Sequence, residues 1–181
     1  MSSSTSSTPG SPGTAPDFII RAEAPADATS IDGVVRRAFG PGMNARAASA
    51  LREGVPHAAE HALVAVHDEK LVGTVRFTPF HWGETLALML GPLAVDPSEK
   101  SRGIGRSLMQ QSMGALRSQP PEGIGLVMLV GDLDYYAPFG FKSVPPGRII
   151  LPRPADPART LVCELKTGAL EGVSGTARNA F

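Results

Sequence analysis

The segment from Leu90 to Leu108, LGPLAVDPSEKSRGIGRSL, constrains the fold of this chain more than any other. It joins an apolar strand to a helix through a short polar loop that ends in Gly103, Ile104 and Gly105. A helix that begins there presents unpaired backbone N–H groups, and the positive end of its dipole, to whatever lies in the loop. The segment therefore predicts a strand, a phosphate-binding loop and a helix.

Two familiar nucleotide loops do not fit this segment. A dinucleotide fingerprint requires a third glycine where Leu108 stands, and no Lys-Ser or Lys-Thr pair follows the glycine spacing of a P-loop. The spacing that remains is a long polar residue, two more residues and then Gly-x-Gly. It resembles the acyl-CoA-binding signature of the GNAT acetyltransferase superfamily, and in this chain it runs from Lys100 to Gly105.

A second block, DYYAPFGF, carries the same resemblance. Tyr136 stands five residues before Phe141, which forms a Gly-Phe pair with Gly140. This spacing resembles the other signature of the superfamily. LGPLAVDP and YYAPFGF together look like a branch of small bacterial N-acetyltransferases whose acceptors are mostly unassigned.

Hydrophobic periodicity predicts a mixed α/β domain between two glycine-rich ends. The predicted strands are 18–21, 62–66, 71–77, 85–95, 124–130, 139–144 and 160–166, and the predicted helices are 27–39, 44–53 and 103–118, the first two capped by Asp27 and Asn44. Strands 85–95 and 124–130 are expected to be parallel and joined by a right-handed crossover. The order looks like the GNAT fold: a mixed, mostly antiparallel sheet with a parallel β-α-β cofactor-binding core, flanked by helices.

We expect a single folded domain over residues 17–166. Residues 1–16 are almost entirely Ser, Thr, Pro and Gly, and such a segment is expected to be disordered. It lacks the basic start and apolar middle of a secretory signal. Residues 167–181 form a Gly-rich extension that either wraps the domain surface or extends from it.

Composition argues against several partners. Seventeen basic residues balance seventeen acidic ones, so no overall field draws the protein to nucleic acid or an anionic membrane. No apolar run approaches the roughly 18 residues of a membrane span. The single cysteine, Cys163, permits no intramolecular disulfide, which favours a cytoplasmic location. We expect Cys163 to be a buried packing residue. His57 and His61 have i, i+4 spacing but no third ligand, so we expect no metal site.

The resemblance implies that the chain binds acetyl-CoA as its acyl donor. The pyrophosphate would lie against the backbone N–H groups of residues 102–107, with Arg102 or Arg106 adding charge. The backbone of Leu93 would polarise the thioester carbonyl, and Val95 would pair with the pantetheine amide. Lys100 departs from the usual Gln or Arg. The implied cofactor-binding residues are Leu93, Ala94, Val95, Lys100, Ser101, Arg102, Gly103, Ile104, Gly105, Arg106, Ser107 and Tyr136.

Leu93 and Tyr136 are the implied catalytic residues. A phenol near the thioester sulfur can protonate the departing thiolate, and the motif spacing favours Tyr136 over its rival Tyr135. Many relatives carry a glutamate as general base in the strand before the loop, but LALMLGPLAV has none. The remaining candidates for the general base are Glu84, Asp132, Asp134 and His81, each of which would act through a water chain. Otherwise water alone accepts the proton.

We therefore expect an N-acetyltransferase that passes an acetyl or other acyl group from coenzyme A to a primary amine by direct attack in a ternary complex. The alternative is a non-catalytic acyl-CoA-binding sensor or interaction module on the same fold. The acceptor surface is expected to come from the two N-terminal helices, a turn at residues 80–82 and the proline-rich loop 145–157. A homodimer is common in the resembling family.

Overall fold

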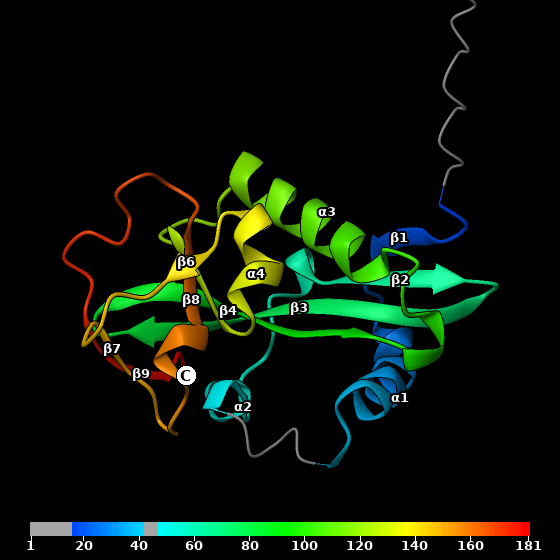
Figure 1. Cartoon of the computed structure of the whole chain (residues 1–181), viewed down its shortest axis with the longest axis horizontal. Coiled ribbons are helices and arrows are strands. Elements are labelled where there is room, and N and C mark those ends of the chain that lie inside the picture. Colours follow the sequence, from blue (N-terminus) through cyan, green and yellow to red (C-terminus); the bar gives the residue numbers. More distant parts are fainter. Residues whose placement is uncertain (1–15, 42–46) are drawn as a thin grey trace, which may run out of the picture.

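The computed structural model describes residues 16–41 and 47–181. The predicted disorder of residues 1–16 concerns positions outside these ranges, apart from Pro16, and so does the predicted cap Asn44. The described chain forms a long, twisted sheet with α3 on one face and α1 and α2 on the other (Figure 1).

The elements follow the predicted order. The helices are α1 (Ala28–Phe39), α2 (Ala47–Arg52), α3 (Ile104–Ser118) and the short α4 (Leu133–Tyr136). The strands are β1 (Ile19–Ala22), β2 (Leu63–His67), β3 (Lys70–Trp82), β4 (Thr85–Val95), β5 (Leu126–Val130), β6 (Lys142–Ser143), β7 (Ile149–Ile150), β8 (Thr160–Glu164) and β9 (Gly175–Asn179).

The main sheet has the strand order β1-β2-β3-β4-β5-β8-β6. β4 and β5 are parallel, with Leu88 opposite Val127 and Met89 opposite Met128, and α3 connects them. The other neighbours in this order are antiparallel. The predicted mixed α/β fold with a parallel β-α-β core is therefore confirmed.

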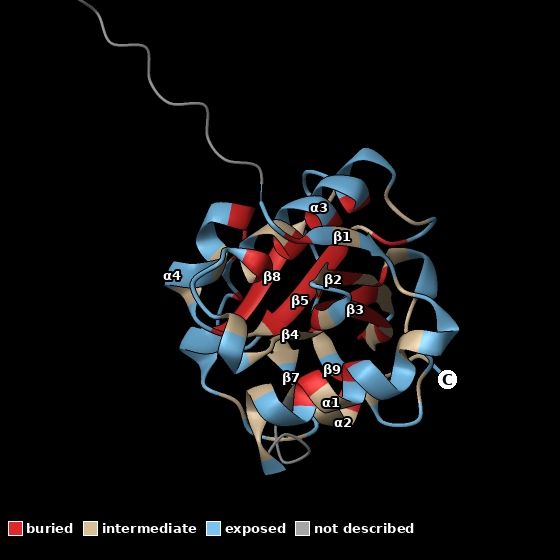
Figure 2. Ribbon diagram, turned by 90° about the vertical axis from the view of Figure 1, so that its right-hand side faces the viewer, coloured by how far each residue is buried: buried red, intermediate tan, exposed pale blue. Residues whose placement is uncertain are grey.

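Two apolar layers hold the sheet between its helices. On one face Leu108 and Met109 of α3 pack against Phe77 and Leu88 of the sheet, and all four are almost completely buried. Burying each such side chain contributes about 1.5–3 kcal/mol. β5 and β8 are buried along their length (Figure 2). No helix among the described residues has both the length and the apolar character needed to cross a membrane.

The longest strand extends further than its sequence pattern predicted. β3 continues through Phe80 to Trp82, so residues 80–82 form strand rather than the predicted turn. The first half of β3 pairs with β2, and its last three residues pair with β9. The C-terminal stretch, which we expected to wrap the domain or extend from it, thus adds a strand to the sheet.

The closing strands are shorter than predicted. β6 covers only two residues, because Phe139 ends a 3-10 turn. β8 begins at the predicted Thr160. The proline-rich loop contains β7, which pairs with β9 in parallel. β9 thus joins this loop to the edge of β3.

Asp27 stands at the predicted start of α1, but its carboxylate does not cap the helix. Instead it accepts two hydrogen bonds from the Arg21 guanidinium, at 2.7 and 2.8 Å, and one from the backbone N–H of Ala24. The hydrogen bond from Arg21 is the main cause that lowers the pKa of Asp27 to about 2. Asp27 therefore joins β1 to the start of α1 by an ion pair.

Candidate active site

The parallel strands β4 and β5 separate soon after they pair. Their pairing covers only Leu88 and Met89 of β4, whereas β4 stays paired with β3 as far as Val95. A cavity of about 520 Å³, here called the cleft, opens between them. Residues 90–93 of β4 line one side and residues 129–132, at the end of β5, line the other. The edge of β4 that faces the cleft can therefore pair with an extended ligand, as an added strand would.

A bulge turns β4 at the cleft. Leu90 lies opposite Phe77 and Leu93 lies opposite Val75, so Gly91 and Pro92 together oppose one residue of β3. This irregularity confirms the bulge that the Gly-Pro pair predicts. Leu93, just after the bulge, lines the cleft.

The start of α3 has the geometry of an anion-binding site. Gly103, at the N-cap, has a φ of +79°, which only glycine adopts without strain. No described atom lies within 4 Å of the point where a Cβ would stand. Among the described residues, nothing accepts from the backbone N–H groups of Ile104, Gly105 and Arg106, whereas the N–H of Ser107 donates to Gly103 at 3.0 Å. Ile104, Gly105 and Arg106 therefore supply the backbone N–H groups that are available to an anion.

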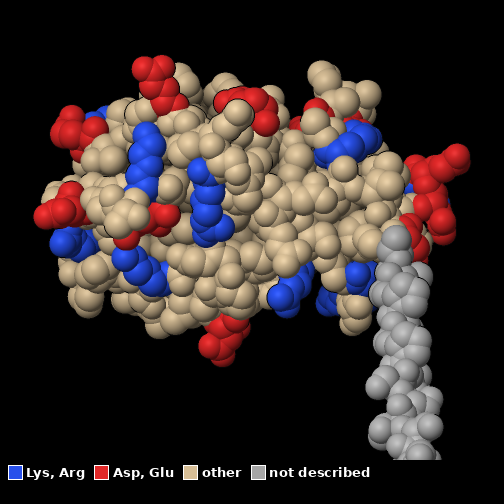
Figure 3. Space-filling model, turned by 90° about the horizontal axis from the view of Figure 1, so that it is seen from above, with Lys and Arg blue, Asp and Glu red and all other residues tan. Residues whose placement is uncertain are grey.

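The structure separates the two arginines that the sequence left as alternatives. Arg102 pairs with Asp17 and with Glu99, each at 2.6 Å, and so is held beside β1 and the loop. Arg106 is exposed, forms no ion pair within the described residues, and lies close enough to Tyr135 to affect its pKa. Lys100 is also exposed. On the α3 side of the molecule, acidic and basic side chains are interspersed (Figure 3).

Both tyrosines line the cleft, in different surroundings. The hydroxyl of Tyr135 lies over the start of α3, 2.9 Å from where a Cβ of Gly105 would stand. The ring of Tyr136 packs against Gly131 at the end of β5 and edge-on against Phe141, with ring centres 5.8 Å apart. Tyr135 therefore faces the start of α3, whereas Tyr136 faces the end of β5.

Burial favours the protonated form of Tyr136. It raises the pKa of that phenol to about 12, with Tyr135 adding to the shift and Arg159 opposing it. Burial also raises the pKa of Tyr135, with Arg106 opposing. A phenol with a raised pKa keeps its proton at neutral pH, as a general acid must.

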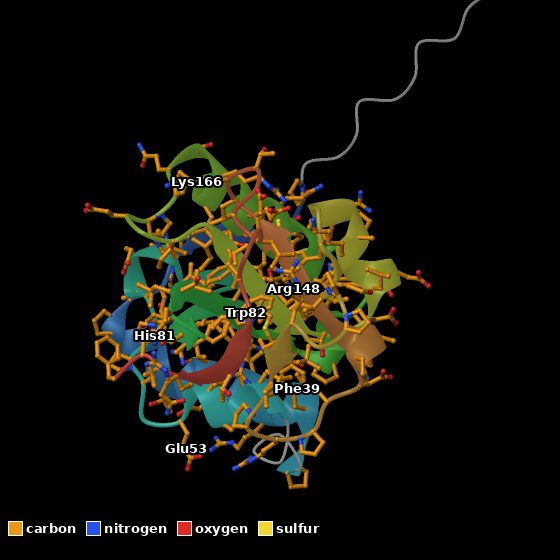
Figure 4. All side chains as sticks on the ribbon, turned by 90° about the vertical axis from the view of Figure 1, so that its left-hand side faces the viewer. Phe39, Glu53, His81, Trp82, Arg148 and Lys166 are labelled. Atoms are coloured by element: carbon orange, nitrogen blue, oxygen red, sulfur yellow. The ribbon has the colours of Figure 1, made fainter. Side chains whose placement is uncertain are left out.

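The four carboxylate and histidine candidates for the base differ in position. Glu84 is almost fully exposed at the β3–β4 turn, where it pairs with Arg178. His81 lies at the β9 edge of β3, away from Phe39 at the cleft (Figure 4). Asp134 is exposed on α4 and does not line the cleft. Asp132 lines the cleft, and its carboxylate caps α4 by accepting from the N–H of Asp134.

A second cavity, here called the α1/α2 cavity, lies beside the cleft and has a volume of about 370 Å³. Gly91, Pro92 and Arg52 line both cavities. The Arg52 guanidinium approaches to 2.5 Å from where a Cβ of Gly91 would stand, and the φ of +135° at Gly91 is one that other residues rarely adopt. The other residues that line it are Asp32, Val35, Ser49, Glu53, Val55, His57, Arg76, Thr78 and Arg153.

A polar cluster that the sequence pattern did not reveal borders this cavity, which His57 and Arg76 line. Arg76 of β3 donates two hydrogen bonds to Glu23, at 2.7 and 2.8 Å. The Nε2 atom of His57 lies 3.3 Å from the same carboxylate. These residues are distant in sequence, and only the pairing of β1, β2 and β3 brings them together.

The two histidines at i, i+4 do not share a helix. His57 precedes a 3-10 turn that contains His61, and His61 lies near Glu60 instead. Within the described ranges, no three His, Cys, Asp or Glu side chains are grouped to hold a metal ion. Cys163 is buried, as predicted, and accepts from Arg117 at 3.2 Å.

Comparisons with known proteins agree with this geometry. The sequence model of the acetyltransferase (GNAT) family matches residues 36–141. The uncharacterized N-acetyltransferase YhbS of Escherichia coli K12 is 32% identical over 161 residues, which cover 87% of this chain and 93% of the relative.

Two solved structures are similar. The crystal structure of Escherichia coli YhbS in complex with CoA superposes with a TM-score of 0.75 and 29% identity, covering 94% of this chain and 93% of the other. A GNAT family acetyltransferase of Brucella melitensis in complex with acetyl-CoA superposes with a TM-score of 0.55 and 30% identity, covering 81% and 96%. The family match and the identity to the Escherichia coli protein show that this chain belongs to the GNAT family and is an acyl-CoA-dependent N-acyltransferase.

Proposed function

We propose that this protein transfers an acetyl group from acetyl-CoA to a primary amine by direct attack within a ternary complex. The observation that carries this proposal is the meeting of two cavities at one point of β4. The cleft contains the proposed donor site, and the α1/α2 cavity reaches the same Gly91 and Pro92. Two substrates that enter from these sides would meet beside Leu93.

The donor would be held along the edge of β4 and the start of α3. The N–H groups of residues 104–106 and the Arg106 guanidinium would bind the pyrophosphate, because charge-assisted hydrogen bonds to backbone and arginine suit that anion. Leu93, Ala94 and Val95 would hold the pantetheine arm on the unpaired edge of β4. The solved YhbS and Brucella structures contain CoA and acetyl-CoA, which supports this assignment.

Two groups would carry the chemistry at the thioester. The backbone N–H of Leu93 would stabilise the negative charge that develops on the carbonyl oxygen. As the amine nitrogen bonds to the carbonyl carbon and the carbon–sulfur bond breaks, Tyr136 would give its proton to the departing thiolate. The Tyr136 phenol is protonated before the thiolate forms, as this role requires.

Substitution of the two tyrosines tests this assignment. Tyr136→Phe is expected to lower the rate of acetyl transfer about 100-fold, the typical contribution of a general acid, while leaving CoA affinity unchanged. Tyr135→Phe is the matched control and is expected to affect binding more than turnover. Thiol release measures transfer, and calorimetric titration with CoA measures affinity. Equal transfer rates for wild type and Tyr136→Phe would contradict the assignment.

The α1/α2 cavity is proposed as the acceptor site. The described residues that line it carry charges of both signs and form no acidic cluster of the kind that favours polycations. The acceptor is therefore proposed as a small molecule or a protein amine without further assignment. A cytoplasmic location, a bacterial source and a homodimer stay predictions from the sequence.

A further inference from the structure

Direct attack requires a neutral amine. An alkylammonium ion ordinarily has a pKa of about 10.4, so at neutral pH almost every acceptor arrives with an extra proton. That proton must pass to a base beside the attacked carbonyl. β4 carries no carboxylate, and the Asp132 carboxylate already caps α4.

Among the described residues that line the α1/α2 cavity, one carries an imidazole. His57 lines this cavity together with Gly91, at which the donor and acceptor sites meet. Its side chain is 29% exposed and can therefore exchange protons with solvent. Histidine is the side chain that changes charge near neutral pH, which suits it to accepting and releasing a proton in each cycle.

Glu23 lies beside this imidazole. Its side chain is only 9% exposed, and Arg76 occupies both carboxylate oxygens. The Nε2 atom of His57 lies 3.3 Å from Oε1 of Glu23. An imidazole whose protonated Nε2 faces a carboxylate has its lone pair on Nδ1. A carboxylate that orients an imidazole in this way is a recurrent partner of a basic histidine.

The other charged groups around His57 suit the role less well. Arg52, Arg76 and Arg153 line the cavity as cations and do not act as bases. Asp32 and Glu53 also line it, but both are solvent-exposed, whereas His57 is partly buried beside Glu23. Among the described residues that line this cavity, His57 is therefore the candidate base.

We propose that His57, oriented by Glu23, is the general base that deprotonates the acceptor. The inference rests on the acyl transfer proposed above. His57 takes a proton from the ammonium, directly or through one water, and returns it to solvent. The neutral nitrogen bonds to the acetyl carbon and the carbon–sulfur bond breaks. The nitrogen then loses a second proton, which replaces the proton that Tyr136 gives to sulfur. The products are the amide, the free thiol and one proton.

Two amines of similar size test this role. Ethylamine is protonated at neutral pH, whereas 2,2,2-trifluoroethylamine is largely neutral and needs no base. His57→Gln is expected to lower kcat/KM for ethylamine about 100-fold and to change kcat/KM for trifluoroethylamine little. His61→Gln is the matched control, because His61 lines neither cavity. Thiol release at saturating acetyl-CoA gives the rates, and calorimetry checks that both variants bind CoA as wild type does.

The outcomes separate this inference from the proposed function. An unchanged ethylamine rate in His57→Gln would overturn the inference. An equal loss with both amines would also overturn it, because it would indicate a structural effect. If wild type released no thiol with either amine, the proposed acyl transfer itself would be contradicted.

Discussion

Gly105→Ala tests the phosphate-binding loop without disturbing the fold. The Cβ of an alanine would stand 2.9 Å from the hydroxyl of Tyr135 and 3.5 Å from Cγ2 of Val95. The hydroxyl would therefore have to withdraw by about 0.5 Å to reach ordinary contact at 3.4 Å. The new methyl would occupy the space between β4, Tyr135 and the start of α3, where the pyrophosphate is proposed to lie.

The two expected effects have opposite signs. Alanine gains about 0.5–1 kcal/mol over glycine inside a helix, so the free energy of unfolding should stay the same or rise. A methyl that keeps the anion from one N–H group removes a hydrogen bond to a charged group, which is worth about 1.5–3 kcal/mol. The Kd for CoA should therefore rise roughly 10- to 100-fold.

Calorimetric titration with CoA and urea denaturation measure the two effects. Gly114→Ala is the matched control, because Gly114 lies in the same helix and a Cβ there meets nothing within 4 Å. That control should gain stability and bind CoA as wild type does. Wild-type CoA affinity in Gly105→Ala would refute the placement of the phosphate.

Two further predictions concern charged side chains. Arg106→Gln should raise the Kd for CoA about tenfold at low salt, and by less at high salt because screening weakens an exposed contact. Arg102→Gln should change the Kd for CoA little. Equal increases in Kd for the two variants would contradict the assignment of Arg106, rather than Arg102, to the pyrophosphate. Asp27→Asn should lower the free energy of unfolding by about 1 kcal/mol at neutral pH, after allowance for solvent screening of the exposed Arg21. Because the folded pKa of Asp27 lies below its ordinary value, the stability difference between wild type and Asp27→Asn should disappear as the pH falls towards 2. Urea denaturation at several pH values measures it, and a difference that stays constant with pH would contradict the role of the Asp27 ion pair.

The elements around the donor site were predictable because their signals are local. β4 agrees with its predicted bounds, and α3 differs only in starting one residue later, at Ile104. Alternating and helical periodicity, with glycines at the boundary, specify both within one stretch of sequence. The bulge at Gly91 was predictable for the same reason.

Features that depend on distant segments were not predictable. β9 has a sequence, GTARN, with no strand pattern, and it forms because the end of β3 leaves an edge that it can pair. Arg102 was an open candidate for the phosphate in the sequence, because its pairing with Asp17, 85 residues away, depends on the fold. His57 stood in the sequence as half of a possible metal pair, and its contact with Glu23 follows from the packing of β1 beside β2.

Transfer of isotopically labelled acetyl from acetyl-CoA to an amine tests the central claim most directly. The purified protein would be incubated with labelled acetyl-CoA and ethylamine, and the products separated and identified by mass spectrometry. The account predicts labelled N-acetylethylamine and an equal amount of free CoA thiol, both reduced together in Tyr136→Phe. Tight CoA binding with no labelled amide above the protein-free control would contradict it.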